Sequence, residues 1–145
     1  VLDPEAIAAW QQRARDMIVD QGVLDYAVNL VLATRDPAHY GMPDLAPMID
    51  YGASPRASLG LVAAGRALAS LRGREYVVPQ DVFDIAPDVL RHRIVPSYEA
   101  LAADVGVELI LSRLLSTVPA PLVSPSTQDP GVDDASFAPP PPPSA

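Results

Sequence analysis

Residues 51–71 read YGASPRASLGLVAAGRALASL, and this stretch decides the fold. After Pro55 the apolar residues recur at helical spacing along two sides of one helix, which we expect over about residues 55–71. One side carries Leu59, Val62, Ala63 and Ala67, and the other carries Leu61, Ala64, Leu68 and Leu71. A helix that is apolar around most of its circumference is buried on several sides, so we predict that it lies in the middle of a helical bundle.

The start of this helix carries the most informative candidate site. Ser54 suits the N-cap, and Pro55 suits the first helical position, where its missing N–H would have had no partner. Arg56 then falls in the first turn, where a cation opposes the helix dipole at a cost of about 0.3 to 1 kcal/mol. A phosphate would remove that cost, because helix N-termini and guanidinium groups both bind phosphate oxygens. The alternative is a surface arginine paired with a nearby carboxylate such as Asp50.

Two helices are predicted before this stretch. Asp3 and Pro4 open the first, which Gly22 ends, and we place Trp10 in the core. Its apolar repeat is Ile7, Trp10, Ala14, Met17 and Ile18. The second covers about residues 23–35, and its apolar face is Val23, Tyr26, Ala27, Leu30 and Val31. The segment 36–53 is rich in proline and glycine and is expected to be a long loop.

Two further helical regions are predicted after it. Gly73 is the expected C-cap of the helix over residues 55–71, and residues 76–78 form a short extended link. Pro79 starts a fourth helical region, which Pro87 is expected to bend or split. A fifth helix over about residues 104–117 buries Val107, Ile110, Leu111 and Leu114. The fold class is therefore all-α, a small bundle of about four to five helices with at most one short pair of strands.

The composition changes abruptly after Val118. Residues 119–145 contain the run Pro139–Pro143 and few large apolar side chains. Such a segment buries too little apolar surface to offset its ordering entropy, so we expect a disordered tail with local polyproline II structure. A role as a proline-rich ligand is the alternative. The expected organisation is one helical domain over residues 1–118 and a disordered tail over 119–145.

Composition excludes several function classes. The 145-residue chain has no cysteine, so thiolate metal sites and disulfides are absent. All ten basic residues are arginines, and a chain without lysine cannot form a P-loop or a Schiff base. The net charge of −8 argues against a nucleic-acid partner. No apolar run approaches the length of a membrane span, and the start shows no signal peptide, so we expect a cytoplasmic location and a chain that is a piece of a longer protein.

Other polar residues have structural interpretations. His39 and His92 lie in unrelated contexts, so we expect neither a catalytic nor a metal pair, and His92 is expected to cap a helix end or pack on a neighbour. Asp81, Asp84 and Asp88 recur at helical spacing. Asp81 suits the helix dipole, and the three together suit a solvated face better than a cation site. No serine has a histidine at a readable spacing, so nucleophilic catalysis is not indicated.

Several ordered motifs together carry a family resemblance. They are Gly52-Ala53-Ser54-Pro55-Arg56-Ala57, Gly73-Arg74-Glu75-Tyr76-Val77, Pro79-Gln80-Asp81-Val82, Val89-Leu90-Arg91-His92-Arg93-Ile94 and Leu114-Leu115-Ser116-Thr117-Val118-Pro119. Over about residues 1–119 the chain resembles the C-terminal lid domain of MoxR-type AAA+ ATPases. Two segments depart from the family pattern, the variable loop at residues 38–48 and the proline-rich tail.

The resemblance implies a helical lid over the nucleotide cleft of a ring-forming ATPase. Arg56 matches the sensor 2 arginine, which contacts the ATP γ-phosphate, and Ser54 and Pro55 belong to the same motif. The Walker motifs then lie in a preceding core domain, so ATP and Mg²⁺ are cofactors of the intact protein, and the fragment alone is expected to bind neither and to be inactive. Expected partners are this core domain, neighbouring ring subunits and von Willebrand A domain proteins. The function implied is chaperone-like assembly or maturation of client proteins.

The alternative function is a free-standing helical interaction module without a nucleotide role. An exposed Arg56 at a helix start favours the lid. An Arg56 held in a salt bridge beside an apolar groove favours the module.

Overall fold

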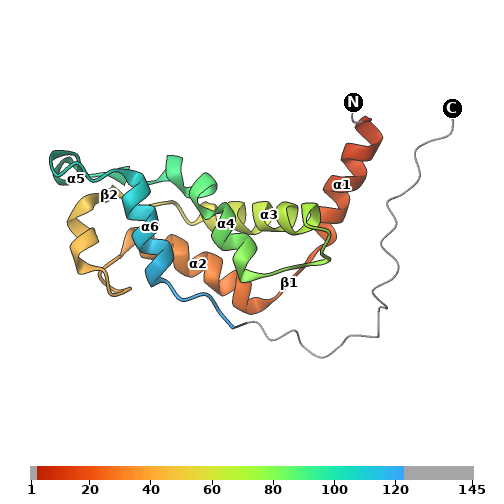
Figure 1. Ribbon diagram of the computed structural model, residues 1–145, viewed down its shortest axis with the longest axis horizontal. Helices are drawn as coiled ribbons and strands as arrows, with labels where there is room; N and C mark the ends of the chain where they lie inside the picture. The colour runs from red at the N-terminus through yellow and green to blue at the C-terminus, as the bar shows by residue number, and fades with distance from the viewer. Residues whose placement is uncertain (1–2, 123–145) are drawn as a thin grey trace.

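A computed structural model describes residues 3–122, and within them it is almost entirely helical (Figure 1). The elements are α1 (Pro4–Asp16), β1 (Ile18–Val19), α2 (Gln21–Arg35), the 3₁₀ helix η1 (Pro43–Met48), β2 (Ile49–Tyr51), α3 (Arg56–Leu71), β3 (Tyr76–Val77), α4 (Pro79–Leu90), the 3₁₀ helix η2 (Arg91–Arg93), β4 (Val95–Pro96), α5 (Tyr98–Ala102) and α6 (Val107–Thr117). The all-α class is confirmed, but the expectation of at most one short pair of strands is wrong, because β1 pairs with β3 and β2 pairs with β4. The predicted tail over residues 119–145 lies almost wholly outside the described residues, and the last buried residue before it is Val118.

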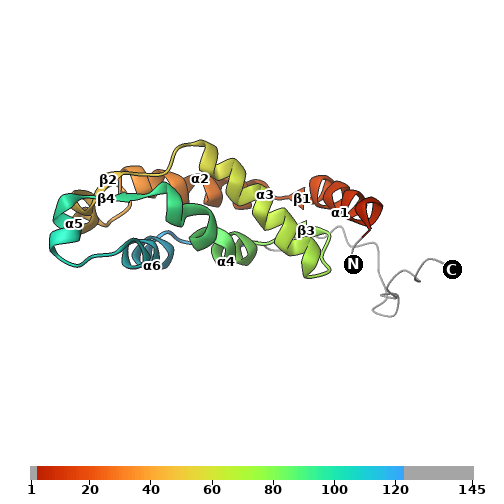
Figure 2. The ribbon, with the colours of Figure 1, turned by 90° about the horizontal axis from the view of Figure 1, so that it is seen from above.

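The elements form an elongated body in which α1 lies at one end and α5 lies at the other with β2 and β4 (Figures 1 and 2). Helix α3 runs through the middle and contacts α1, α2 and, most extensively, α4. The core also includes α6, which packs against α2 and α4. The predicted central place of α3 is therefore confirmed.

Neither predicted apolar side of α3 is fully buried, and the buried side combines Leu61 with residues outside both predicted sets. That side consists of small residues around one leucine, namely Ala57, Leu61, Gly65 and Ala69. Small residues allow close approach: a Cβ added at Gly65 would lie 3.4 Å from a Val77 methyl group and 3.5 Å from a Val82 methyl group. Leu59 and Leu71, one from each predicted side, are 71% and 77% exposed.

The first helix ends earlier than the sequence indicated. Helix α1 stops at Asp16, and Ile18 and Val19 instead form a parallel pair with Tyr76 and Val77 of β3. Gly22 does not end α1. It belongs to the first turn of α2, where its N–H donates to the side chain of the N-cap residue Asp20 at 2.8 Å.

Trp10 is not a core residue, so that prediction is wrong. Helix α1 has no fully buried residue and touches the bundle with one face only, along the C-terminal half of α3. A shallow apolar groove between the two helices is lined by Ile7, Trp10, Ala14, Ala67 and Leu71. Trp10 remains 47% exposed, and the Arg13 guanidinium lies 5.8 Å from the centre of its ring.

Three further predictions need correction. Helix α4 continues through Pro87 without a break. The expected loop at 36–53 contains η1 and β2, and β2 pairs with β4 in an antiparallel ladder. The short helix α5 was not foreseen: Ser97 begins it by accepting a hydrogen bond from the Ala100 N–H at 3.1 Å. The same hydroxyl donates to the Pro47 carbonyl at 2.6 Å, which ties α5 to η1.

The exposed and buried faces of α3 give a direct test. Leu61 is fully buried, so Leu61→Ala should lower the free energy of unfolding by about 2 to 5 kcal/mol. Leu59→Ala removes the same atoms from an exposed position and should cost less than about 0.5 kcal/mol. Urea denaturation of both variants measures the difference, and equal losses would contradict the orientation of α3.

Candidate functional site

The start of α3 presents Arg56 on the surface of the molecule. Arg56 is the first residue of the helix, and its side chain is exposed. Within residues 3–122 its guanidinium group has no carboxylate or hydrogen-bond partner, and the alternative ion pair with Asp50 is not formed. The first turn of α3 contains no acidic residue. The cation therefore lies at the positive end of a helix dipole without compensation from the described part of the chain.

The predicted cap at Ser54 is wrong. The helix begins one residue later, with Pro55 in the N-cap position at φ −54° and ψ −26°, and no side chain caps it. Ser54 contributes its carbonyl, which accepts a hydrogen bond from the Ala57 N–H at 2.8 Å. Pro55 contributes its carbonyl to the Ser58 N–H at 3.2 Å and to the Ser58 hydroxyl at 2.7 Å. Ser54 and Pro55 are both exposed and directly precede Arg56 in the chain.

The turn before Arg56 is packed tightly against the end of α2. A Cβ added at Gly52 would lie 2.3 Å from the carbonyl oxygen of Thr34 and 2.9 Å from the Cα of Arg35. Backbone atoms cannot yield that much space, so only glycine fits this position. Gly52 is therefore required by the close approach of its backbone to the backbone at the end of α2.

Ala53 is held at both of its backbone groups by the last two residues of α2. Its N–H donates to the Thr34 hydroxyl oxygen at 2.9 Å, and its carbonyl accepts a longer bond of 3.4 Å from the Arg35 guanidinium. Ala53 and Thr34 are both fully buried. The turn that carries Arg56 is thus anchored at Ala53 on the end of α2. The next three residues, Ser54, Pro55 and Arg56, are exposed.

Sequence reasoning missed Thr34 and Arg35. They precede the motif by a long and irregular segment, and nothing in their spacing links them to it. The one available signal was Gly52, because a glycine next to a helix start often marks a close backbone approach.

The C-terminal end of α3 is fixed by a different device. Gly73 adopts φ +75°, and the predicted cap is confirmed as a Schellman motif. The Gly73 N–H donates to the Ser70 carbonyl and the Arg74 N–H donates to the Ala69 carbonyl, each at 3.0 Å. This turn directs Arg72 and Arg74 toward the start of α4.

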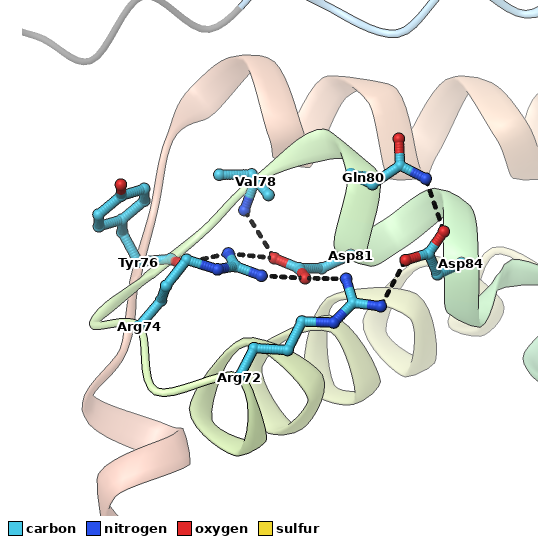
Figure 3. A network of polar contacts seen from close by, with 7 residues as sticks. All are labelled: Arg72, Arg74, Tyr76, Val78, Gln80, Asp81 and Asp84. Atoms are coloured by element: carbon cyan, nitrogen blue, oxygen red, sulfur yellow. Dashed lines mark hydrogen bonds and ion pairs between the residues drawn. The ribbon is translucent and has the colours of Figure 1, made fainter.

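Asp81 is the centre of a polar network at this end (Figure 3). Its carboxylate is fully buried and accepts hydrogen bonds from Arg72 at 2.9 Å, from Arg74 at 2.7 Å and from the Val78 N–H at 2.9 Å. Arg72 extends the network to Asp84. Asp81 is therefore not part of a solvated acidic face, as the sequence indicated, but the internal anion that joins α3 to α4.

The network determines the protonation of both carboxylates. Burial by itself raises the pKa of Asp81, but the hydrogen bonds from Arg74, Val78 and Arg72 outweigh it and hold the pKa below its usual value of 3.8. The pKa of Asp84 is also lowered, by its hydrogen bonds from Arg72 and Gln80. Both groups are thus anions at neutral pH.

The two histidines take no part in either end of α3. His92 is exposed in η2, and the helix end is instead served by Arg93, whose Nε donates to the Val89 carbonyl at 2.9 Å. His39 is exposed beside the Tyr40 ring.

In the described part of the chain, no three histidine, aspartate or glutamate side chains gather as metal ligands. No helix among these residues is long and apolar enough to cross a membrane.

Comparison with known families identifies the class of the domain. Residues 44–112 match the AAA lid domain family, and this range contains the Arg56 turn, α3, the Asp81 network and the start of α6. The bundle is therefore the lid of an AAA+ ATPase.

Individual relatives narrow the assignment. The chain is 49% identical to Chaperone MoxR1 of Mycobacterium tuberculosis over 114 residues, which are 79% of this chain and 30% of that protein. It is 35% identical to Protein MoxR of Methylorubrum extorquens over 128 residues, covering 83% of this chain and 37% of that protein. The chain belongs to the MoxR-type AAA+ ATPases as their lid domain, and it spans about a third of the length of these relatives.

A solved structure supports the same assignment. A candidate ATPase from Cytophaga hutchinsonii superimposes with a TM-score of 0.73 at 36% identity. The match covers 74% of this chain and 33% of that structure. The arrangement of helices seen here is therefore that of a domain embedded in a longer ATPase chain.

The Asp81 network should make the domain sensitive to acid. Because the folded-state pKa is lowered, Asp81 stabilises the fold above its unfolded pKa near 3.8, and this contribution is lost as the pH falls through the folded value. Asp81→Asn should lower the free energy of unfolding at pH 7 by about 2 to 3 kcal/mol, since the two arginines can still turn toward water. Urea titrations at pH 7 and pH 3 measure both effects.

Asp88→Asn is the matched control, because Asp88 lies on the same helix with a side chain that is 68% exposed. It should change stability little at either pH. An Asp81→Asn variant whose stability falls with acid as steeply as that of the wild type would contradict the role of Asp81.

Proposed function

We propose that Arg56 is the sensor 2 arginine of a MoxR-type AAA+ ATPase and that it binds the γ-phosphate of ATP. The observation that carries this proposal is the exposed guanidinium at the start of α3, which has no ion pair within residues 3–122 and lies on a turn fixed by Gly52 and Ala53. Such a group has no partner in the described part of the chain to release when an anion approaches. The family membership of the chain gives the anion its identity as a nucleotide phosphate.

The chemistry of the site fits a terminal phosphate. A planar guanidinium can donate two parallel hydrogen bonds to phosphate oxygens, and the N-terminus of α3 adds the positive end of its dipole. Negative charge on the γ-phosphoryl oxygens redistributes during transfer, so a positioned arginine stabilises the transition state as well as the bound nucleotide. Ser54 and Pro55 would line the approach to Arg56.

The remaining ATPase parts would come from outside this chain. A lysine-free chain cannot supply the Walker A lysine, so we assign the phosphate-binding loop and the Mg²⁺ ligands to a preceding core domain. The lid would contribute the Arg56 guanidinium, and the whole lid would move together with this group. The orientation of this body would couple the nucleotide state to the conformation of a ring of subunits.

Partners follow from the same proposal. The lid would contact its own core domain and neighbouring subunits, and the intact protein would act in the cytoplasm on client proteins, in their assembly or maturation. The name of the Mycobacterium tuberculosis relative, a chaperone, supports this function. Von Willebrand A domain proteins are the proposed adaptor class.

Arg56→Ala in the intact ATPase should reduce turnover roughly 10- to 100-fold while weakening ATP binding less, because the arginine matters most as charge redistributes in the transition state. Arg56→Lys should restore little, since lysine keeps the charge but not the planar fork. Steady-state ATP hydrolysis and equilibrium binding of a fluorescent ATP analogue measure the two quantities.

Arg113→Ala is the matched control, because it removes a surface arginine whose 2.9 Å ion pair with Asp44 lies far along the chain from Arg56. It should leave turnover near the wild-type value. Unchanged hydrolysis in Arg56→Ala, together with a clear loss of stability, would make Arg56 a structural residue and refute the sensor assignment.

The chain alone should show no ATP hydrolysis, because one arginine cannot replace the phosphate loop and the metal ligands. A coupled phosphate-release assay with Mg²⁺ and ATP tests this. Magnesium-dependent turnover by the purified chain would contradict the proposal that the phosphate loop and the Mg²⁺ ligands come from another domain.

A further inference from the structure

Thr34 is a buried polar residue whose hydroxyl connects α2 to the turn that carries Arg56. The hydroxyl donates to the Val31 carbonyl at 2.6 Å and accepts from the Ala53 N–H at 2.9 Å. The first bond is common for a threonine in a helix and fixes the rotamer of the side chain. The second bond crosses to another element and uses the oxygen that this rotamer directs outward from α2.

The environment makes this second bond difficult to replace. Thr34 and Ala53 both have zero exposed surface, so water cannot take the place of the hydroxyl. An N–H that is buried without an acceptor is costly, and the backbone would shift to avoid it. The contact of Gly52 with the Thr34 carbonyl leaves no room for a shift toward α2, so the turn would move away from it.

Such a movement of the turn would also displace Arg56. Only Ser54 and Pro55 separate Ala53 from Arg56 along the chain, and one of the first hydrogen bonds of the helix start is made between Ser54 and Ala57. The Arg35 bond to the Ala53 carbonyl, at 3.4 Å, is too long to hold the turn by itself.

We propose that Thr34 is the positioning residue of the Arg56 site and that its hydroxyl sets the direction in which the guanidinium meets the nucleotide. This inference rests on the proposed function of Arg56. It adds that the end of α2 is part of the nucleotide-sensing unit, because a displacement of α2 is transmitted to Arg56 through one hydrogen bond.

The experiment is a double-mutant cycle in the intact ATPase. Thr34→Val keeps the shape of the side chain and removes the acceptor, and it should lower turnover roughly tenfold with ATP affinity changed much less, as expected for a misaligned catalytic contact. Thr34→Ser keeps the hydroxyl and should stay within about twofold of the wild type. In the Arg56→Ala background, Thr34→Val should cause no further loss, because the residue acts through Arg56.

Thr117→Val is the matched control, since it removes a threonine hydroxyl from an exposed position at the end of α6. It should leave turnover unchanged. If Thr34→Val does not fold, Thr34→Cys takes its place, because a thiol of similar size is a weaker acceptor and should give an intermediate loss.

Each outcome decides between the two proposals. An additive loss in the double variant, or full turnover in Thr34→Val with reduced turnover in Arg56→Ala, would overturn the role of Thr34 and leave the function of Arg56 in place. Full turnover in Arg56→Ala would overturn the function of Arg56 itself. Faster amide hydrogen exchange at Ala53 in Thr34→Val than in Thr34→Ser would support the loss of the hydrogen bond directly.

Discussion

Close approach of α3 to its neighbours is the constraint on which the rest of this domain depends. The buried face of α3 is built from Ala57, Leu61, Gly65 and Ala69, so α4 and β3 can lie against its backbone. The same principle operates at its start, where Gly52 lets the chain touch the end of α2. Small residues cost little side-chain entropy, and they leave little freedom in how the helices are placed. A rigid central helix also fixes the position of the turn at its start, where the proposed sensor Arg56 lies.

The two ends of α3 are fixed by opposite kinds of interaction. At the C-terminal end the internal Asp81 anion is surrounded by Arg72 and Arg74, so charge is fully matched inside the fold. At the N-terminal end the turn is held by the close backbone approach at Gly52, the Thr34 hydroxyl and a long bond from Arg35, and no carboxylate among residues 3–122 pairs with Arg56. Charge is therefore paired at the C-terminal end of α3, whereas the described residues pair no anion with Arg56 at its start.

Sequence reasoning succeeded where the determinants are local. Pro79 and Gly73 marked helix ends correctly because capping depends on a few adjacent residues, and the apolar repeat found α2 and α3. It failed for β1, whose two residues pair with β3 from a distant part of the chain. The burial of Asp81 was missed because its arginine partners come from another helix end. The turn before Arg56 could be predicted only in part. Its motif is visible in the sequence, but the hydrogen bond between Ala53 and Thr34 joins residues that meet only in the folded chain.

The groove between α1 and α3 gives the domain an optical property. Trp10 is the single tryptophan in the chain, and its ring is half exposed beside Ile7 and Leu71. Its emission therefore reports the polarity of this one surface and of no other. When another protein surface covers α1, the indole leaves water and its fluorescence shifts to shorter wavelength. The native chain thus carries its own probe of docking on this side, without any added label.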